Sequence, residues 1–181
     1  EIADLGTKLY QDKRFFDAVI IFRRALKVAP DNLFVIAHVA IAKIQVGKIT
    51  DARVGLEKVL LKKPKDLLVL TNLAIVYSRL KAYDKAIATL KQILEIDPQN
   101  AIAHHDMGVV LGKTGELKES EQYLLRSIAL DPNYAKAHLN LASMYLQQTP
   151  PALDLARASY EKAKSLGCAG DSKIESRLHS P

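Results

Sequence analysis

The stretch Asp97-Pro98-Gln99-Asn100 decides the fold of this chain, because its proline recurs at a fixed distance along the sequence. Pro30, Pro64, Pro98 and Pro132 each lie 34 residues from the next. A fixed period between about 20 and 50 residues is typical of an array in which one supersecondary unit is stacked several times. Each unit buries its apolar face against its neighbours, so the array forms one continuous core.

Residues of matching size fall at matching positions when each repeat is numbered so that its proline is position 32. Small residues recur at position 8 (Gly6, Ala40, Ala74, Gly108 and Ala142) and position 20 (Ala18, Ala52, Ala86 and Ser120). Large residues recur at position 7 (Leu5, Val39, Leu73, Met107 and Leu141) and position 24 (Phe22, Leu56, Leu90 and Leu124). The small residues let two backbones approach closely, and the large ones fill the space beside them. Spacings of three and four keep each set on one face, which predicts two packed helices per repeat.

The turn residues agree with this prediction. Gly47 and Gly115 fall between the two helices of their repeats, where a helix C-terminus favours a left-handed residue. The Asp-Pro steps at 97–98 and 131–132 close second helices, because the residue before proline resists the helical conformation. We expect first helices near residues 2–12, 34–46, 68–80, 102–113 and 136–148, and second helices near 16–28, 50–62, 84–96, 118–130 and 152–166.

The array resembles tetratricopeptide repeats over about residues 1–167. The matching features are the period, Leu followed by Gly or Ala at positions 7 and 8, Tyr at 11, Ala at 20 and Pro at 32. Asn72-Leu73-Ala74-x-x-Tyr77 and Asn140-Leu141-Ala142-x-x-Tyr145 are close matches. The resemblance implies an all-α fold, a right-handed α-solenoid of helix–turn–helix pairs. Its five repeats would span residues 1–32, 33–66, 67–100, 101–134 and 135–168, followed by a capping helix and tail over 169–181.

The sequence departs from the family pattern in two places. Position 4, often Trp in the family, is Ile36, Leu70, His104 and His138 in the second to fifth repeats. The fifth repeat carries two extra residues around Pro150-Pro151, so we expect a longer turn there, with Pro151 starting the second helix.

The tail after Gly167 has the pattern of one short helix. Ser172-x-x-Glu175 is a capping-box pattern, and Ile174 and Leu178 lie one turn apart on an otherwise polar segment. We expect this helix to cover the end of the array, as repeat arrays require.

Positions 2, 6, 9 and 13 share one face of each first helix, and in the family this face lines the concave inner surface. Positions 2 and 9 are apolar in the second to fourth repeats, whereas positions 6 and 13 are polar in all five. In related arrays an asparagine at position 6 contacts bound peptide backbone, and Asn72 and Asn140 match that residue. The predicted peptide-binding residues, here called the first-helix stripe, are Phe34, His38, Ile41, Gln45, Leu68, Asn72, Ile75, Arg79, Ile102, Asp106, Val109, Lys113 and Asn140.

The leading hypothesis is a non-enzymatic scaffold that binds a peptide or helix segment of a partner protein on the first-helix stripe. The apolar members would anchor the segment, and the position-6 residues would supply hydrogen bonds. The alternative for the apolar members is that they only pack against neighbouring first helices. Two other functions stay open. The chain could self-assemble through the stripe or an uncapped first repeat, or serve as the targeting module of a longer enzyme.

No catalytic, cofactor or metal site is expected. The most metal-like cluster is His104-His105-Asp106, in which we expect His104 to face the core while the other two diverge around the stripe. The single cysteine, Cys168, has no evident activating base. A family variant grips a C-terminal carboxylate with cations, but its positions hold Ala3, Thr7, His38, Leu68 and Asn72 in one register and Thr71, Ile75, Asp106, Lys136 and Asn140 in another. Both sets lack the cations needed, so we predict against a chaperone-tail carboxylate clamp.

The composition sets broader limits. The net charge of +6 is moderate, and few aromatics accompany the basic residues, which disfavours a nucleic-acid surface. An uninterrupted apolar run long enough to span a membrane is missing. The sequence opens Glu1-Ile2-Ala3-Asp4 without a methionine, so we expect a fragment whose localisation is set elsewhere.

Overall fold

The computed structural model describes residues 1–178, which contain helices and no strand. The helices are α1 (Ile2–Gln11), α2 (Phe15–Val28), α3 (Leu33–Gln45), α4 (Ile49–Lys62), α5 (Leu67–Arg79), α6 (Tyr83–Ile96), α7 (Ala101–Thr114), α8 (Leu117–Leu130), α9 (Ala135–Gln147), α10 (Leu153–Ser165) and α11 (Ser172–Leu178). The bounds of α1 to α10 lie within one residue of the predicted ones. This confirms the all-α fold of helix–turn–helix pairs.

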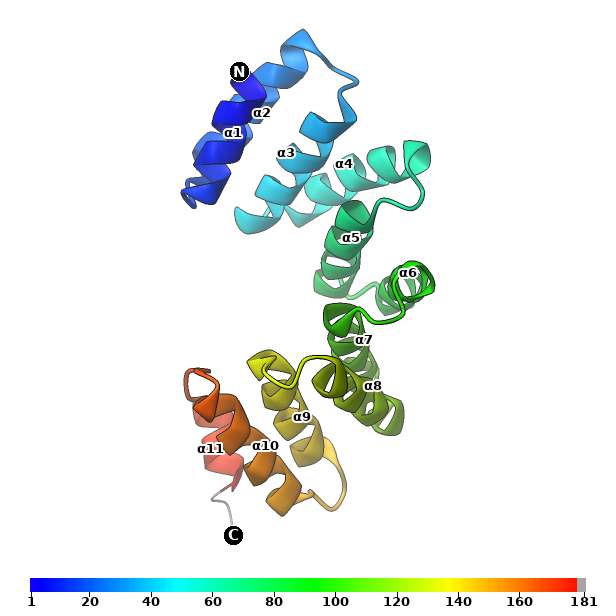
Figure 1. The fold of residues 1–181 in the computed structure, drawn as a ribbon, viewed down its shortest axis with the longest axis vertical. Helices are drawn as coiled ribbons and strands as arrows, with labels where there is room; N and C mark the ends of the chain where they lie inside the picture. The colour runs from blue at the N-terminus through cyan, green and yellow to red at the C-terminus, as the bar shows by residue number, and fades with distance from the viewer. Residues whose placement is uncertain (179–181) are drawn as a thin grey trace. The chain divides into compact units, whose positions relative to one another are not determined.

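The helices form two compact units, Glu1–Gln92 and Ile93 to the end of the chain, with the boundary inside α6. In the first unit each helix from α1 to α5 packs against the next, and the first helices α1, α3 and α5 also contact each other in sequence (Figure 1). In the second unit α7 to α10 pack in the same way, and α11 packs on α9 and α10. Each unit therefore presents a layer of first helices beside a layer of second helices.

The small residues at position 8 allow the close helix pairing within a repeat. A Cβ atom on Gly6 would lie 2.6 Å from the ring of Phe22, the fully buried position-24 residue of α2. A Cβ atom on Gly108 would lie 2.7 Å from Leu124 Cγ. The hydroxyl of Ser120 also donates to the carbonyl of Gly108 at 2.8 Å. The size pattern in the sequence thus has a direct steric cause.

The proline turns supply caps for the first helices that follow them. Asn32, Asp66 and Asn100 each accept a hydrogen bond from the backbone N–H three residues ahead. At the turn that opens the second unit, Asp97 also accepts from the Gln99 backbone and from the Asn100 side chain. These bonds satisfy N–H groups that a helix start leaves unpaired.

The histidines at position 4 are explained by the same turns. His104 Nε2 lies 3.0 Å from the carbonyl oxygen of Pro98, and His138 Nε2 lies 3.1 Å from that of Pro132. An imidazole N–H can donate to these carbonyls, so the side chain ties the first helix back to the preceding turn. The histidines that stand in place of Trp at this position therefore have a structural role.

A left-handed residue separates the two helices in each of the first four repeats. Gly47 and Gly115 have φ of 79° and 91°, which confirms their prediction as helix-ending residues. Lys13 and Lys81 fill the same repeat position with φ of 59° and 58°. The turn geometry is thus the same whether or not the residue is glycine.

The turn in the fifth repeat is longer, as predicted, but the prediction that Pro151 starts the helix is wrong. The helix α10 begins at Leu153. The Ala152 N–H donates to the carbonyl of Tyr145, and the Leu153 N–H donates to that of Pro151. Because these bonds close the turn against the end of α9, the helix cannot start until the turn is complete.

The predicted terminal helix is α11, and its apolar residues are buried as expected. Ile174 and Leu178 join a core cluster with residues of α9 and α10, including Leu146 and Tyr160. The capping-box prediction is wrong, however. The cap is Asp171, whose carboxylate accepts from the N–H groups of Lys173 and Ile174. Glu175 instead accepts a hydrogen bond from the hydroxyl of Tyr160.

Candidate functional site

In the first unit, the first-helix stripe lies on α3 and α5. Phe34 and Leu68, both at position 2, are 53% and 49% exposed. Ile75 is partly buried, and Ile41 is buried in the core cluster that contains Ile36 and Leu73. Within the stripe of this unit, the exposed apolar surface therefore comes mainly from position 2, and Ile41 offers little of it.

The position-6 residues of the first unit are held by their own helices. His38 Nδ1 lies 2.8 Å from the carbonyl oxygen of Phe34, and its ring stacks on the Phe34 ring with centroids 3.9 Å apart. The Asn72 side-chain amide donates to the carbonyl of Leu68 at 2.8 Å. That bond uses one N–H of the Asn72 side-chain amide, so the side-chain carbonyl oxygen is still able to accept a hydrogen bond.

The position-13 residues of the first unit reach the neighbouring first helix. Gln45 Nε2 lies 3.5 Å from the hydroxyl of Tyr10 on α1. Arg79 donates to the carbonyl of Ile44 at 3.2 Å, which lies in the last turn of α3. A cation at a helix C-terminus also interacts favourably with the helix dipole. This edge of the stripe therefore fastens adjacent first helices together.

Tyrosines at position 11 fasten first helices to the preceding second helix. The Tyr77 hydroxyl donates to Glu57 at 2.9 Å, and the Tyr145 hydroxyl donates to Glu121 at 2.8 Å. Burial, followed by these hydrogen bonds to a carboxylate, raises the pKa of both tyrosines to about 12. Both hydroxyls therefore stay neutral at physiological pH.

In the second unit, the stripe lies on α7 and α9. Ile102 is 51% exposed, which matches Phe34 and Leu68 at the same repeat position. Asp106, Val109 and Asn140 are partly buried, and Lys113 is exposed. The apolar anchor and polar neighbours of the first unit are thus repeated here.

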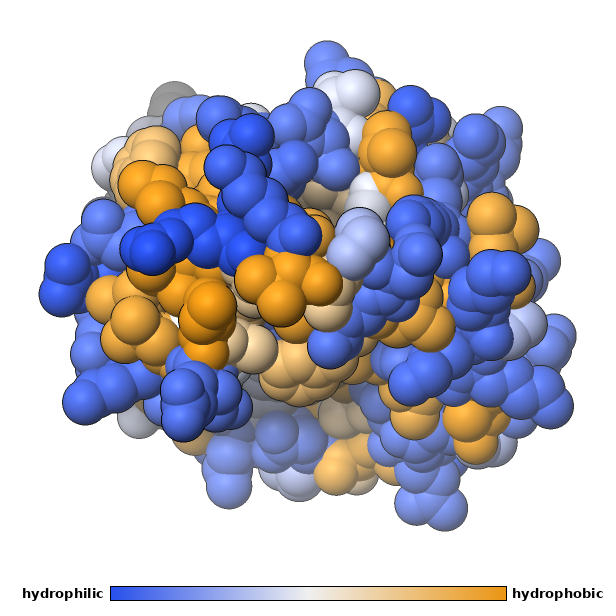
Figure 2. Space-filling view, turned by 90° about the horizontal axis from the view of Figure 1, so that it is seen from above, coloured by the Kyte–Doolittle hydropathy of each residue, from blue (hydrophilic) through white to orange (hydrophobic). Residues whose placement is uncertain are grey.

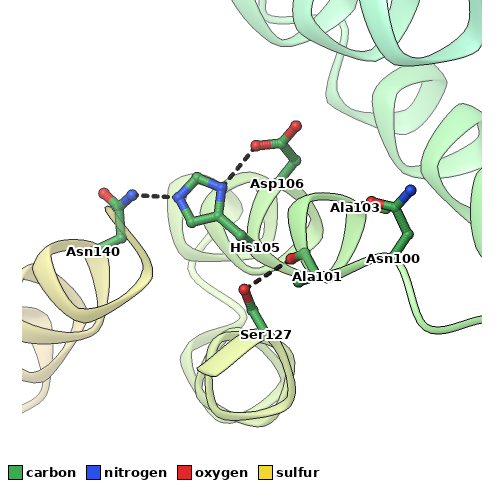
Figure 3. A network of polar contacts seen from close by, with 7 residues as sticks. All are labelled: Asn100, Ala101, Ala103, His105, Asp106, Ser127 and Asn140. Carbon is green, nitrogen blue, oxygen red and sulfur yellow. Dashed lines mark hydrogen bonds and ion pairs between the residues drawn. The ribbon is translucent and has the colours of Figure 1, made fainter. Parts of the chain in front are cut away.

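A buried histidine, expected from the sequence to lie at the surface, joins two members of this stripe (Figure 3). His105 is only 6% exposed, and its ring meets Tyr134 edge-on with centroids 5.0 Å apart. Its Nδ1 lies 2.8 Å from Oδ1 of Asp106, and its Nε2 lies 2.7 Å from Nδ2 of Asn140. His104, which we expected in the core, is partly exposed beside Tyr123.

The burial of His105, which the sequence did not predict, has a geometric reason. Position 5, where His105 stands, faces the neighbouring first helix and is also buried at Ala37. The only signal in the sequence was the adjacency of His105 to the stripe residue Asp106. Burial also raises the pKa of Tyr134, with further contributions from the charges of Asp106 and Asp131.

A hollow between the helices of the second unit was not predicted from the sequence. Its volume is about 130 Å³, and its lining includes Val109, Gly112, Asn140 and Ser143. In the second and fifth repeats the position of Gly112 is filled by buried large side chains, Ile44 and Leu146. The missing side chain at Gly112, one helical turn after Gly108, therefore opens the hollow beside Asn140. A second glycine within a predicted helix was the available signal.

Exposed apolar residues also occur on the first helix pair. They are Ile2 and Leu5 on α1 and Phe16 and Ile20 on α2. Leu5 is 48% exposed, whereas Val39 at the same repeat position is 6% exposed because α1 and α2 cover it. Figure 2 shows apolar residues interleaved with hydrophilic ones in the view from above.

Metal-binding and membrane-spanning features are not found within residues 1–178. A group of three or more side chains able to hold a metal ion does not occur in this range. None of the helices described here has the length and apolar character that crossing a membrane requires. The exposed Lys58 on the second helix α4 pairs with Asp31 at 3.1 Å.

Comparison with solved structures gives close matches of fold. TTC0263, a thermophilic tetratricopeptide protein of Thermus thermophilus, is 26% identical with a TM-score of 0.75, over 98% of this chain and 95% of that one. A MamA structure labelled MSR-1 C2 is 25% identical with a TM-score of 0.74, over 91% and 94%. A MamA RS-1 double mutant, 18% identical over 91% and 92%, has a TM-score of 0.78 and shows the fold alone. A search of curated proteins finds no match.

Two sequence profiles described as tetratricopeptide repeat match the chain. One covers residues 44–108 and 78–127, and the other covers residues 105–171. Proteins with this fold are in general non-catalytic scaffolds for protein–protein interaction. The profile matches, the shared fold and the 34-residue register together show that this chain belongs to the tetratricopeptide repeat family.

Proposed function

We propose that this protein is a scaffold that binds a segment of a partner protein on the first-helix stripe. The observation that carries the proposal is the exposure of Phe34, Leu68 and Ile102, each about half exposed at position 2. The fold does not need these residues for packing, because positions 3, 7 and 10 supply buried contacts to the preceding repeat. In the second repeat those positions are Val35, Val39 and Ala42. A partner segment would remove the apolar position-2 surface from water.

The polar members of the stripe suit an extended backbone. The Asn72 amide is oriented by its bond to the Leu68 carbonyl, so its oxygen is the group left to accept a partner N–H. In the second unit, Asn140 offers an amide beside the hollow opened by Gly112. An apolar side chain of the bound segment would fill that hollow while its backbone bonds to Asn140.

A displayed random-peptide library supplies a probe of defined sequence. Peptides selected on the immobilised protein are labelled, and their affinities are measured by fluorescence anisotropy. In the second unit, Ile102→Ala and Asn140→Ala should each weaken binding by roughly tenfold, the loss of one apolar anchor or one hydrogen bond. Gln122→Ala, an exposed polar change on the second helix α8, is the matched control and should have no effect.

The melting temperature and helicity of each variant are measured in parallel. Ile102→Ala should stay close to the unaltered protein in both, because Ile102 is about half exposed. Asn140→Ala should keep the helicity and lower the melting temperature modestly, because it leaves Nε2 of the buried His105 without its hydrogen-bond donor. If the selected peptides bind all variants with the same affinity, the stripe is not their binding site and the proposal is refuted.

Self-association through the first repeat is the second candidate function. It is favoured by Leu5, an exposed apolar residue at a position that other repeats bury. Burial of this residue in a contact between two copies would remove the same apolar surface from water. Sedimentation over a concentration series should then show a dimer that Leu5→Asp abolishes. A chain that stays monomeric throughout the series would refute this candidate.

A further inference from the structure

The hydrogen-bond partners of His105 determine where its proton lies. An ionised carboxylate only accepts hydrogen bonds, so His105 Nδ1, 2.8 Å from Asp106, must carry the ring proton. The Asp106 side chain is about a quarter exposed, which keeps the carboxylate in contact with water. In the neutral ring the other nitrogen, Nε2, is then an acceptor.

The same logic fixes the orientation of the amide on the next first helix. The Asn140 side chain lies 2.7 Å from Nε2 and must present its NH₂ group to an acceptor. Its oxygen therefore points away from the histidine, as Figure 3 shows. Asn140 also lines the hollow with Val109 and Gly112, so its orientation decides which group that surface offers.

We propose that His105 is a positioning residue that holds the Asn140 amide with its oxygen toward the bound segment, so that this point of the stripe selects a partner N–H donor. The proposal rests on the proposed function and names the group that a partner must present. Partners that offer a carbonyl at this point are disfavoured, because two acceptors would face each other.

Protonation of His105 reverses this selection. Both ring nitrogens then donate, and Asn140 must turn its amide so that its oxygen faces Nε2. The stripe would then present NH₂ in place of the carbonyl oxygen. The titratable groups that contact the ring are Asp106 on α7 and Tyr134 on the turn before α9, and the charge of Asp131 acts on Tyr134.

Nuclear magnetic resonance of the free protein tests the coupling without any partner. The imidazole ¹⁵N shifts of His105 should identify the Nδ1–H form at about pH 8. The side-chain NH₂ resonances of Asn140 should move together with the titration of His105. Asp106→Asn removes the obligate acceptor and should yield a mixture of the two ring tautomers. An Nε2–H ring in the unaltered protein, or Asn140 resonances that ignore the His105 titration, would overturn the proposal.

Peptides selected on the immobilised protein test how the orientation of the Asn140 amide by His105 affects binding. A peptide selected at about pH 8 should bind about threefold to tenfold more weakly at about pH 5, the effect of one hydrogen bond. His105→Phe should remove that part of the pH dependence, whereas His104→Gln, outside the stripe, should not remove it. If the phenylalanine variant does not fold, His105→Gln must give the same result, because glutamine does not titrate.

The two outcomes are separable from those of the stripe itself. Loss of binding in Ile102→Ala and Asn140→Ala, together with a pH dependence in the His105 variants equal to that of the unaltered protein, would refute the role of His105 and keep the stripe. Binding that ignores the stripe variants would refute the proposed function.

Discussion

Repeat position 15 offers a direct test of how backbone conformation limits the stability of this array. The residue there is left-handed in four repeats, as glycine at 47 and 115 and as lysine at 13 and 81. The four residues therefore share one backbone conformation and differ in their side chains. We predict that Gly115→Ala destabilises the protein and that Lys81→Gly stabilises it.

The magnitude follows from the surroundings of the glycines. A Cβ atom on Gly47 or Gly115 would meet no heavy atom within 4 Å, so the substitution adds no steric contact. The left-handed conformation costs an L-residue about 1–2 kcal/mol, and alanine recovers about 0.4–1 kcal/mol by restricting the unfolded chain. The net loss for Gly115→Ala should be about 1 kcal/mol. Lys13→Gly and Lys81→Gly should gain a similar amount by the reverse argument.

Urea denaturation followed by far-ultraviolet circular dichroism measures these changes. With a slope of about 2 kcal/mol per molar, a change of about 1 kcal/mol moves the midpoint by about 0.5 M. The slope itself should stay constant, because the surface exposed on unfolding is the same. Lys81→Ala serves as the control, since it removes the lysine side chain and keeps the left-handed strain. An unchanged midpoint in Gly115→Ala, or a lower one in Lys81→Gly, would refute the reasoning.

Three further predictions concern contacts described above. Asp171→Ala should lower the free energy of unfolding by about 1 kcal/mol through loss of the α11 cap, whereas Ser172→Ala should change it by less than about 0.3 kcal/mol; equal losses in thermal denaturation would contradict the cap assignment. Leu178→Ala should cost about 2–3 kcal/mol, because its side chain is buried against α9 and α10, and a smaller change than in Leu155→Ala, which is exposed, would argue against that packing. The raised pKa values of Tyr77 and Tyr145 mean that the unfolded chain loses these protons first, so stability should fall as the pH rises from about 10 to about 12. Tyr77→Phe and Tyr145→Phe should reduce this alkaline loss relative to the unaltered protein, and identical pH profiles would contradict it.

The helix pairs, their bounds and their turns could be predicted from the sequence because each depends on local and repeated information. Proline spacing, small residues at positions 8 and 20, and Gly47 and Gly115 recur in one register. Where the pattern in one repeat is ambiguous, the residues at the same positions of the other repeats still identify the helices. The predicted turn in the fifth repeat went wrong at Pro151, where the register is interrupted and no other repeat supplies a template.

The residues of the first-helix stripe could also be identified from the 34-residue register, but the burial of each residue could not. Three position-2 residues share the same exposure, as their equivalent places predict. Ile41 is buried although Ile75 and Val109, at the same position, are only partly so. Burial at a repeat position depends on the sizes of neighbours on the adjacent helix, which vary from repeat to repeat.

What the sequence determined by itself is therefore the period, and with it the alternation of first and second helices and the set of residues that share one face of each first helix. Periodicity specifies which face of a helix points inward, because that property repeats every turn. Tertiary structure alone decided that His105 lies between α7 and α9, that Asn140 meets its Nε2, and that Gly112 opens a hollow beside them. His105 and Asn140 are 35 residues apart, and a contact across that distance depends on how two helices pack. The proton on a single imidazole nitrogen follows from that packing, and so does the group that the stripe presents.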